Sequence, residues 1–252
     1  MTKVFYQCAT GPNNGFIQDV REQAIPSFQY IYVHDEYVTP VPDRGWEYLN
    51  INDFVPDAKT YGHKQRFAKA RPDILFPDAE YTVWLDPKWY ISREFFELCN
   101  SVDSEWMLLP HPDPDRTTLL DELTFAFNNG TLNFEECERV LDVIKTRGYH
   151  PSQFYSSLAT WMIRSNSKKN VEIGRLWYEL IDEAYDNFVR DQVFLPFCIP
   201  RDHFDMTHDV SEIEESGCLF YYPPSERIRP KTSDHTEEDV SSLISVTFSS
   251  IS

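Results

Sequence analysis

An aspartate and a lysine follow a short apolar segment, at a position where α/β proteins bind ligands. Residues 81–85 read Tyr-Thr-Val-Trp-Leu, which is typical of a buried strand, and Asp86-Pro-Lys88 follows directly. Ligands of open α/β sheets bind at the carboxyl ends of strands, so Asp86 and Lys88 are candidates for contacting one. The simpler alternative is that Asp86 only forms a turn. Trp89 and Tyr90 come next and are the aromatic pair expected to be exposed, where a ring can stack on a bound ligand.

A run of basic residues precedes this strand in a chain that is otherwise acidic. The chain has 41 Asp and Glu against 23 Lys and Arg, a net charge of −18, whereas residues 59–71 contain no acid. Such a run is often a solvated helix face. It also favours a site for a small phosphate-bearing ligand, because arginine binds phosphate with two parallel hydrogen bonds. The cations of this run are Lys59, Lys64, Arg66, Lys69 and Arg71.

Short apolar segments alternate with helical patterns, which predicts a mixed α/β layer architecture. We expect strands at 4–9, 28–34, 46–50, 82–86, 106–109 and 158–164. A helix is expected from about Val171 to Phe188, because its apolar residues recur at spacings of three and four. A second helix is predicted after Asn133, whose side chain would form a capping box with Glu136, and Gly148 would end it.

The length and composition predict one domain with an appended tail. With 252 residues, 41% of them hydrophobic, and only 8 glycines, the chain is neither disordered nor collagen-like. We expect a single domain over residues 1–222. Residues 223–252 are rich in Pro, Ser, Thr and charge, so they are expected to form a partly mobile tail or a short docking segment.

The acidity and the cysteines exclude several classes of partner and site. An acidic surface repels nucleic acid and anionic lipid, so neither is an expected partner. The five cysteines are scattered and show neither zinc spacing nor a disulfide framework. No segment approaches the ~18 consecutive apolar residues of a membrane span, and no export signal is evident. A reducing cytoplasm is therefore the expected compartment, while the sequence gives no indication of oligomeric state.

The residues around the strand end resemble a known family. The run KQRFAKARPDILFPDAEYTVWLDPKW is similar to the core of the TOD1/MUCI70 glycosyltransferase-like domain family, which has a basic helix, a Leu-Phe-Pro turn and a Trp-Ile-Asp-Gly strand end in that order. Three further motifs agree in order: His-Pro followed by Arg116 and Glu122, Met-Ile-Arg-Ser-Asn at 162–166, and Arg-Asp-Gln at 190–192. The resemblance extends over residues 4–200.

The resemblance implies a GT-A-like, Rossmann-like catalytic domain with a mostly parallel sheet, in which a nucleotide-diphosphate sugar lies across the strand ends. It implies transfer of a monosaccharide from that donor to a glycan or glycosylated acceptor. Asp86 corresponds to the acid that meets the ribose or a divalent metal. Asp191 and Gln192 correspond to an Asp-Gln pair that contacts the sugar or supplies the catalytic base. The other donor-binding positions that it implies are Arg66, Lys69, His111 and Arg116.

Whether a metal is needed is an open point of the resemblance. A DxD motif places two carboxylates around one Mg²⁺ or Mn²⁺, and Asp86 would be the first of them. The third position here is Lys88, so we hypothesise that its ammonium supplies part of the charge that a metal would give. Mn²⁺ or Mg²⁺ as a cofactor stays the alternative.

Two other groups have the spacing of metal ligands. Asp113-Pro-Asp115 is a literal DxD beside His111, although a Pro-rich acidic turn explains it more simply. His203 and His208 are spaced like a late metal ligand, although isolated surface histidines explain them as well.

Sugar transfer requires two kinds of group. Cations must stabilise the diphosphate leaving group as its charge develops, a role that suits Lys88, Arg66 or Lys69. An inverting enzyme also needs a carboxylate as general base, for which Asp191 is the first candidate and Glu122 the second. Asp191 would otherwise cap a short helix. The alternative function is a non-catalytic sugar- or protein-binding module on the same fold, and a hydrolase is weaker because it gives the basic run no role.

Overall fold

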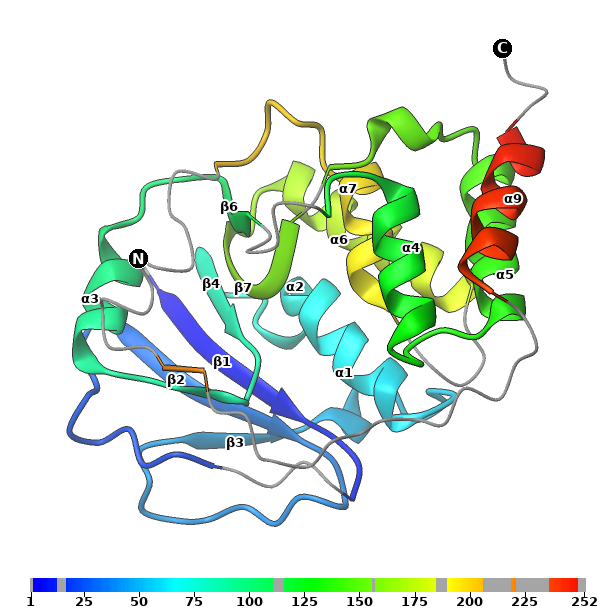
Figure 1. Ribbon diagram of the computed structural model, residues 1–252. Helices are drawn as coiled ribbons and strands as arrows, with labels where there is room; N and C mark the ends of the chain where they lie inside the picture. The colour runs from blue at the N-terminus through cyan, green and yellow to red at the C-terminus, as the bar shows by residue number, and fades with distance from the viewer. Residues whose placement is uncertain are drawn as a thin grey trace.

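The computed structural model describes residues 2–12, 17–110, 116–155, 157–184, 190–205, 219–220 and 236–248. Its centre is a six-stranded sheet in the order β3-β2-β1-β4-β7-β6, with helices packed against it (Figure 1). The strands are β1 (Lys3–Ala9), β2 (Phe28–His34), β3 (Glu47–Asn50), β4 (Tyr81–Leu85), β6 (Trp106–Pro110) and β7 (Ser157–Ser165). Each lies within a residue or two of a predicted strand.

The helices fall mainly between β3 and β4 and after β6. The α-helices are α1 (Tyr61–Ala70), α2 (Pro72–Leu75), α3 (Arg93–Ser101), α4 (Leu119–Asn128), α5 (Phe134–Thr146), α6 (Lys168–Ala184), α7 (Leu195–Cys198) and α9 (Glu237–Phe248). Three short 3₁₀ turns are η1 (Ile51–Asp53), η2 (Pro151–Gln153) and η3 (Asp191–Val193). A second, two-stranded sheet joins β5 (Trp89–Tyr90) to β8 (Leu219–Phe220).

The central sheet is mostly parallel. β1 pairs in parallel with β2 and β4, and β2 pairs in parallel with β3. Only β7 runs against its neighbours, because it pairs antiparallel with both β4 and β6. The mixed α/β fold class and its mostly parallel sheet are therefore confirmed.

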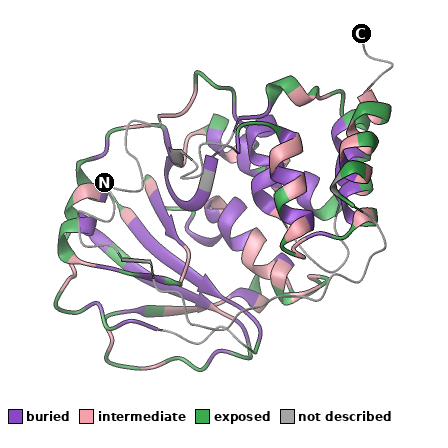
Figure 2. Ribbon diagram, viewed as in Figure 1, coloured by how far each residue is buried: buried purple, intermediate pink, exposed green. Residues whose placement is uncertain are grey.

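Both faces of β1 are buried, as the run of apolar residues in this strand requires. Val4, Tyr6 and Cys8 point into the larger core, which α1, α5 and α6 cover. Phe5 and Ala9 point into the smaller core, to which α3 contributes. This alternation follows from the period of two in a strand. Figure 2 shows the same continuous burial through β1 and β4.

The two helices with the clearest sequence signals form as predicted. Asn133 Oδ1 accepts from the Glu136 backbone N–H at 2.8 Å, and Glu136 Oε2 accepts from the Asn133 N–H at 2.8 Å. α5 ends before Gly148, whose φ of 74° lies in the left-handed region that suits glycine. α6 begins at Lys168, three residues before the predicted start, and Phe188 lies outside the described residues.

α1 and α6 come into close contact at Gly174 of α6. Replacing this glycine by alanine should therefore have the opposite effect on stability from the usual one. A Cβ on Gly174 would lie 2.3 Å from the Ala70 carbonyl oxygen, at the end of α1. Gly to Ala inside a helix ordinarily stabilises by roughly 0.5–1 kcal/mol. Here we expect Gly174→Ala to destabilise by about 1–3 kcal/mol, because a backbone atom must move to make room. Urea unfolding measures the change, and a stabilised variant would contradict the packing.

Part of the predicted tail is ordered helix. Residues 223–235 lie outside the described residues, but α9 packs against α4 and α5, and its Val240 is fully buried. Leu243, Ile244 and Phe248 add partly buried contacts with the same core. The C-terminal segment therefore completes the helical layer next to α4.

Among the described residues, no helix is long and apolar enough to cross a membrane. The four described cysteines, Cys8, Cys99, Cys137 and Cys198, are buried free thiols.

Candidate active site

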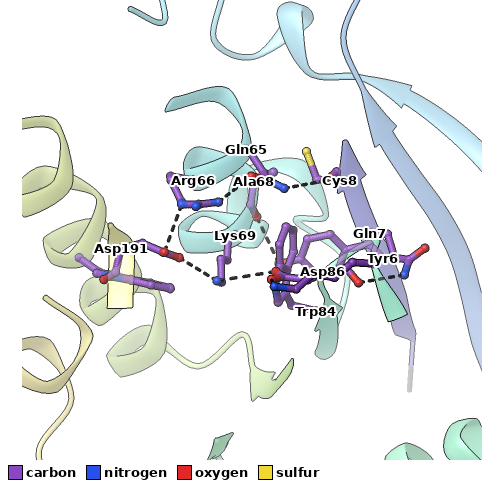
Figure 3. Close-up of polar contacts among 12 residues, drawn as sticks. Tyr6, Gln7, Cys8, Gln65, Arg66, Ala68, Lys69, Trp84, Asp86 and Asp191 are labelled. Carbon is purple, nitrogen blue, oxygen red and sulfur yellow. Dashed lines mark hydrogen bonds and ion pairs between the residues drawn. The ribbon is translucent and has the colours of Figure 1, made fainter. Parts of the chain in front are cut away.

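A buried ion pair joins α1 to η3. Lys69 Nζ lies 2.7 Å from Asp191 Oδ2, and these side chains are only 4% and 8% exposed. Arg66 Nε lies 3.2 Å from the other carboxylate oxygen, Oδ1 (Figure 3). The α1 spacing of three places Arg66 and Lys69 on one helix face, so both reach the same acid. Arg66 and Lys69, which are far from Asp191 in the sequence, therefore both contact its carboxylate.

Asp191 does not cap a helix, contrary to the alternative considered from sequence. It is the first residue of η3, and the preceding residue, Arg190, makes no side-chain capping bond. The Asp191 backbone carbonyl accepts from Trp177 Nε1 at 2.9 Å, which ties η3 to α6. Gln192 follows and is also buried.

Asp86 lies just past the end of β4, where the sequence predicts it, and three donors surround its carboxylate. Trp84 Nε1 donates to Oδ1 at 3.0 Å, Lys69 Nζ is 3.9 Å from Oδ1, and Lys88 Nζ is 3.6 Å from Oδ2. The backbone is fixed as well, since the Asp86 N–H donates to the Thr160 carbonyl at 2.8 Å. Asp86 is therefore held rigidly at the strand end, with its side chain 16% exposed.

Glu122 and two arginines form a second ion cluster. Glu122 is 1% exposed, and its two oxygens pair with Arg116 and with Arg190, the latter at 2.7 Å. Both carboxylate oxygens are thus already bound by guanidinium groups. Arg190 connects this cluster to the first, because it directly precedes Asp191 and its charge also acts on that acid.

Together the two clusters form a locally cationic region in an acidic protein. They hold five cations against three acids, so their net charge is +2, whereas the chain carries −18. Lys69 and Arg116 are nearly buried, while Lys88 is 43%, Arg190 is 21% and Arg66 is 20% exposed. The accessible cations are those that can meet an anion from solvent.

The basic run as a whole does not form this region. Lys59 pairs with Asp182, Lys64 pairs with Glu36, and Arg71 pairs with Asp73, two residues further on. The prediction of one cationic patch over residues 59–71 is therefore wrong in extent, because only Arg66 and Lys69 contribute to the site.

A buried arginine that the sequence does not mark as functional fixes the end of α1. Arg164 on β7 is 3% exposed and donates to the carbonyls of Lys69 and Ala70 and to the Tyr6 hydroxyl. A guanidinium at the C-terminal end of a helix satisfies unpaired carbonyls and favours the helix dipole. Arg164 thereby positions Lys69. Arg164 is the arginine of the Met-Ile-Arg-Ser-Asn motif at 162–166, which marked the residue in the sequence but did not indicate this structural role.

The other candidates lie apart or outside the description. Among residues 111–115, His111 and the Asp113-Pro-Asp115 pair lie outside the described residues, as does His208. His203 Nε2 instead contacts Asn170 Oδ1 at 2.7 Å. Of the aromatic pair after β4, only Tyr90 is exposed, at 45%, whereas Trp89 is buried.

The surroundings of Asp86 do not fit a divalent cation. Its two oxygens face the ammonium groups of Lys69 and Lys88 and the Trp84 N–H, all of which are donors. A hard cation needs several oxygen ligands. Among the residues that the structure describes, no three His, Cys, Asp or Glu side chains gather in such an arrangement.

The charge state of Asp191 gives a prediction on acid stability. Burial alone would raise its pKa, but attraction by Arg66 and Lys69 outweighs burial and holds the pKa well below its usual range. Because the unfolded carboxyl titrates near ~3.9, this stabilisation is complete above that pH and is lost as the pH falls below it. We expect Asp191→Asn to flatten the acid limb of a melting-temperature profile. Parallel profiles for the variant and the wild type would contradict the pairing.

Neither a family model nor a curated protein sequence matches this chain. Two solved structures have a similar fold: the galactosyltransferase LgtC in complex with donor and acceptor sugar analogs, and mouse xyloside xylosyltransferase 1 in its apo form. The first is 9% identical with a TM-score of 0.44, covering 98% of this chain and 96% of LgtC. The second is 10% identical with a TM-score of 0.44, covering 82% and 85%. A similarity this low supports no conclusion about function. The functional argument therefore rests on the residues of the site.

Proposed function

We propose that this chain is a glycosyltransferase that moves a monosaccharide from a nucleotide-diphosphate sugar to a glycan or glycosylated acceptor. One observation carries the proposal. The basic helix, the strand-end acid and the Arg-Asp-Gln motif, which are widely separated in sequence, meet in one ion network at the end of β4. These are the motifs on which the resemblance to the TOD1/MUCI70 family rests. If the separate motifs resembled the family only by chance, they would have no reason to meet in space.

The proposed donor site uses the exposed cations of the network. As the anomeric C–O bond breaks, negative charge develops on the leaving diphosphate, and preorganised cations stabilise that charge most effectively. Lys88, Arg190 and Arg66 are the accessible members. Lys88 at the end of β4 and Arg66 on α1 are our candidates for this contact, while Arg190 is held by Glu122. Lys69 is buried between Asp191 and Asp86, so we assign it to fixing the two acids. Gln192 and Arg116 remain proposed donor contacts.

Asp191 remains our candidate base, with a condition that its ion pairs impose. Attraction by Arg66 and Lys69 makes a carboxylate weakly basic. A bound diphosphate that attracts Arg66 would leave Asp191 with one fewer cation and would raise its basicity. Glu122 is a poorer candidate, because its side chain is only 1% exposed, against 8% for Asp191, and two guanidinium groups hold its oxygens. We assign it to positioning Arg116 and Arg190.

We predict that transfer does not require a divalent metal. Lys88 and Lys69 already place two ammonium groups beside Asp86, where a divalent metal ion would otherwise supply the positive charge. Nucleotide release from the donor in excess EDTA should therefore match the rate without chelator. Loss of activity in EDTA that Mn²⁺ restores would contradict this prediction.

A thermal-shift screen against UDP-, GDP- and dTDP-sugars, with and without Mn²⁺, tests the donor site, and a CMP-sugar, which carries a single phosphate, is the control. A ligand at 100 times its Kd adds about 2.7 kcal/mol to the free energy of unfolding. We expect one nucleotide series to raise the melting temperature, and Lys88→Ala to weaken that rise. A wild-type protein that no nucleotide sugar stabilises would overturn the proposal. Stabilisation without any nucleotide release would favour a sugar-binding module on the same fold.

A further inference from the structure

A cleft between α4 and α9 has the lining of a carbohydrate-binding site. Its volume is about 520 Å³, within the ~300–1,000 Å³ typical of small-molecule sites. α4 contributes Asp121, Thr124, Phe125 and Asn128, and α9 contributes Glu238 and Ser241. One aromatic ring among hydroxyl, amide and carboxylate groups offers both surfaces that a sugar ring needs, an apolar face and many hydrogen-bonding partners.

The aromatic residue of this cleft is exposed but rigidly held. Phe125 is 39% exposed, and the Arg116 guanidinium lies 3.7 Å from its ring centroid. Arg116 is in turn fixed by its ion pair with buried Glu122. A ring held in place by a neighbour loses little freedom when a ligand stacks on it, which favours binding. Phe125 therefore supplies a preorganised platform for the apolar face of a sugar.

The cleft is connected to the proposed transfer site. Arg190 lies 6.0 Å from the Phe125 ring centroid and donates to Glu122 Oε1 at 2.8 Å. The next residue in the chain is Asp191, the candidate base. The cleft therefore lies beside the chain segment that carries the candidate base.

The charge of the lining separates this cleft from a donor site. Its ionisable lining groups are Asp121 and Glu238, both acidic. The two arginines beside the Phe125 ring are paired with Glu122, whereas Lys88 of the donor region is 43% exposed. A diphosphate is repelled by carboxylates and a neutral sugar is not. We propose that the α4–α9 cleft binds a neutral glycan as the acceptor, with Phe125 as the stacking platform. Its role as an acceptor site rests on the proposed function.

The experiment measures binding of neutral oligosaccharides by saturation-transfer NMR, without any donor. The probes are short oligomers of glucose, galactose, mannose, xylose and N-acetylglucosamine. We expect the wild type to bind at least one series, Phe125→Ala to weaken that binding at least tenfold, and Ser241→Trp to abolish it by filling the cleft. Tyr37→Ala, which removes another exposed aromatic ring, is the matched control and should bind as the wild type does.

Three results would overturn the cleft proposal: no probe bound by the wild type, unchanged binding by both cleft variants, or stronger binding of an oligogalacturonate than of neutral sugars. Melting temperatures establish that the variants fold. Nucleotide release without acceptor is a separate readout of the donor site, and the control Tyr37→Ala should leave its rate unchanged. Neutral glycan binding without nucleotide release would therefore contradict the proposed function but support glycan binding in the α4–α9 cleft.

Discussion

Asp191→Asn is expected to destabilise the protein by about 3–5 kcal/mol and to lower nucleotide release by roughly 10²–10⁴-fold. The stability loss follows because Lys69 is 4% exposed and, among the described residues, would be left with Asp86, 3.9 Å away, as its acidic partner. The loss of activity follows from removing the candidate base. Urea unfolding and release of nucleoside diphosphate measure the two effects.

A surface ion pair provides the control for this variant. Lys59 and Asp182 lie 3.1 Å apart but are 44% and 50% exposed, so Asp182→Asn should cost no more than about 1 kcal/mol. Adding Lys69→Met to Asp191→Asn removes the stranded ammonium and should recover much of the stability without recovering activity. Equal losses from Asp191→Asn and Asp182→Asn would contradict a buried pair, and an active Asp191→Asn would remove Asp191 from the mechanism.

Arg164→Met is expected to destabilise by about 3 kcal/mol, because a buried guanidinium contributes hydrogen bonds that two helix-end carbonyls and a hydroxyl would lose. The acceptors are the backbone of Lys69 and Ala70 and the side chain of Tyr6. For a chain of this size the melting temperature should fall by roughly 6–12 °C. Since α1 also carries Arg66, the folded variant should release nucleotide more slowly.

The choice of replacement at Arg164 separates charge from shape. Arg164→Lys keeps the charge at the helix end but cannot reach all three acceptors, so its stability should lie between those of wild type and Arg164→Met. Arg175→Met on α6 removes an exposed arginine paired only with Glu172 and Glu179, and it should change the melting temperature little. An Arg164→Met protein as stable as Arg175→Met would contradict the assigned role.

The sheet could be predicted because its signals are local. β1 and β4 are short apolar runs bounded by polar or turn residues, and each strand lies within one residue of its predicted position. The cap of α5 is likewise contained within four neighbouring residues. The ordered C-terminal helix α9 was less apparent, because its buried face consists of a few apolar residues within a polar segment. Among the described elements, α4 and α5 pack against that face.

The site was predictable only in part, because its partners come from distant parts of the chain. Asp86 was found from its place after a strand, a local feature. The sequence did not pair Lys69 with Asp191, nor show that Glu122 is enclosed by two arginines. Charge counting likewise overestimated the basic run, since Lys59 and Lys64 are paired with acids from other segments. A count of charges along the sequence does not include the acids that the fold brings next to each lysine.

Release of nucleoside diphosphate from nucleotide sugars, measured in EDTA without added acceptor, tests the central claim most directly. The wild type should release one nucleotide preferentially, and Lys88→Ala and Asp191→Asn should each reduce the rate. Adding a neutral acceptor glycan should accelerate release by the wild type. No release from any donor, with or without Mn²⁺ and acceptor, would contradict the assignment of this site to sugar transfer.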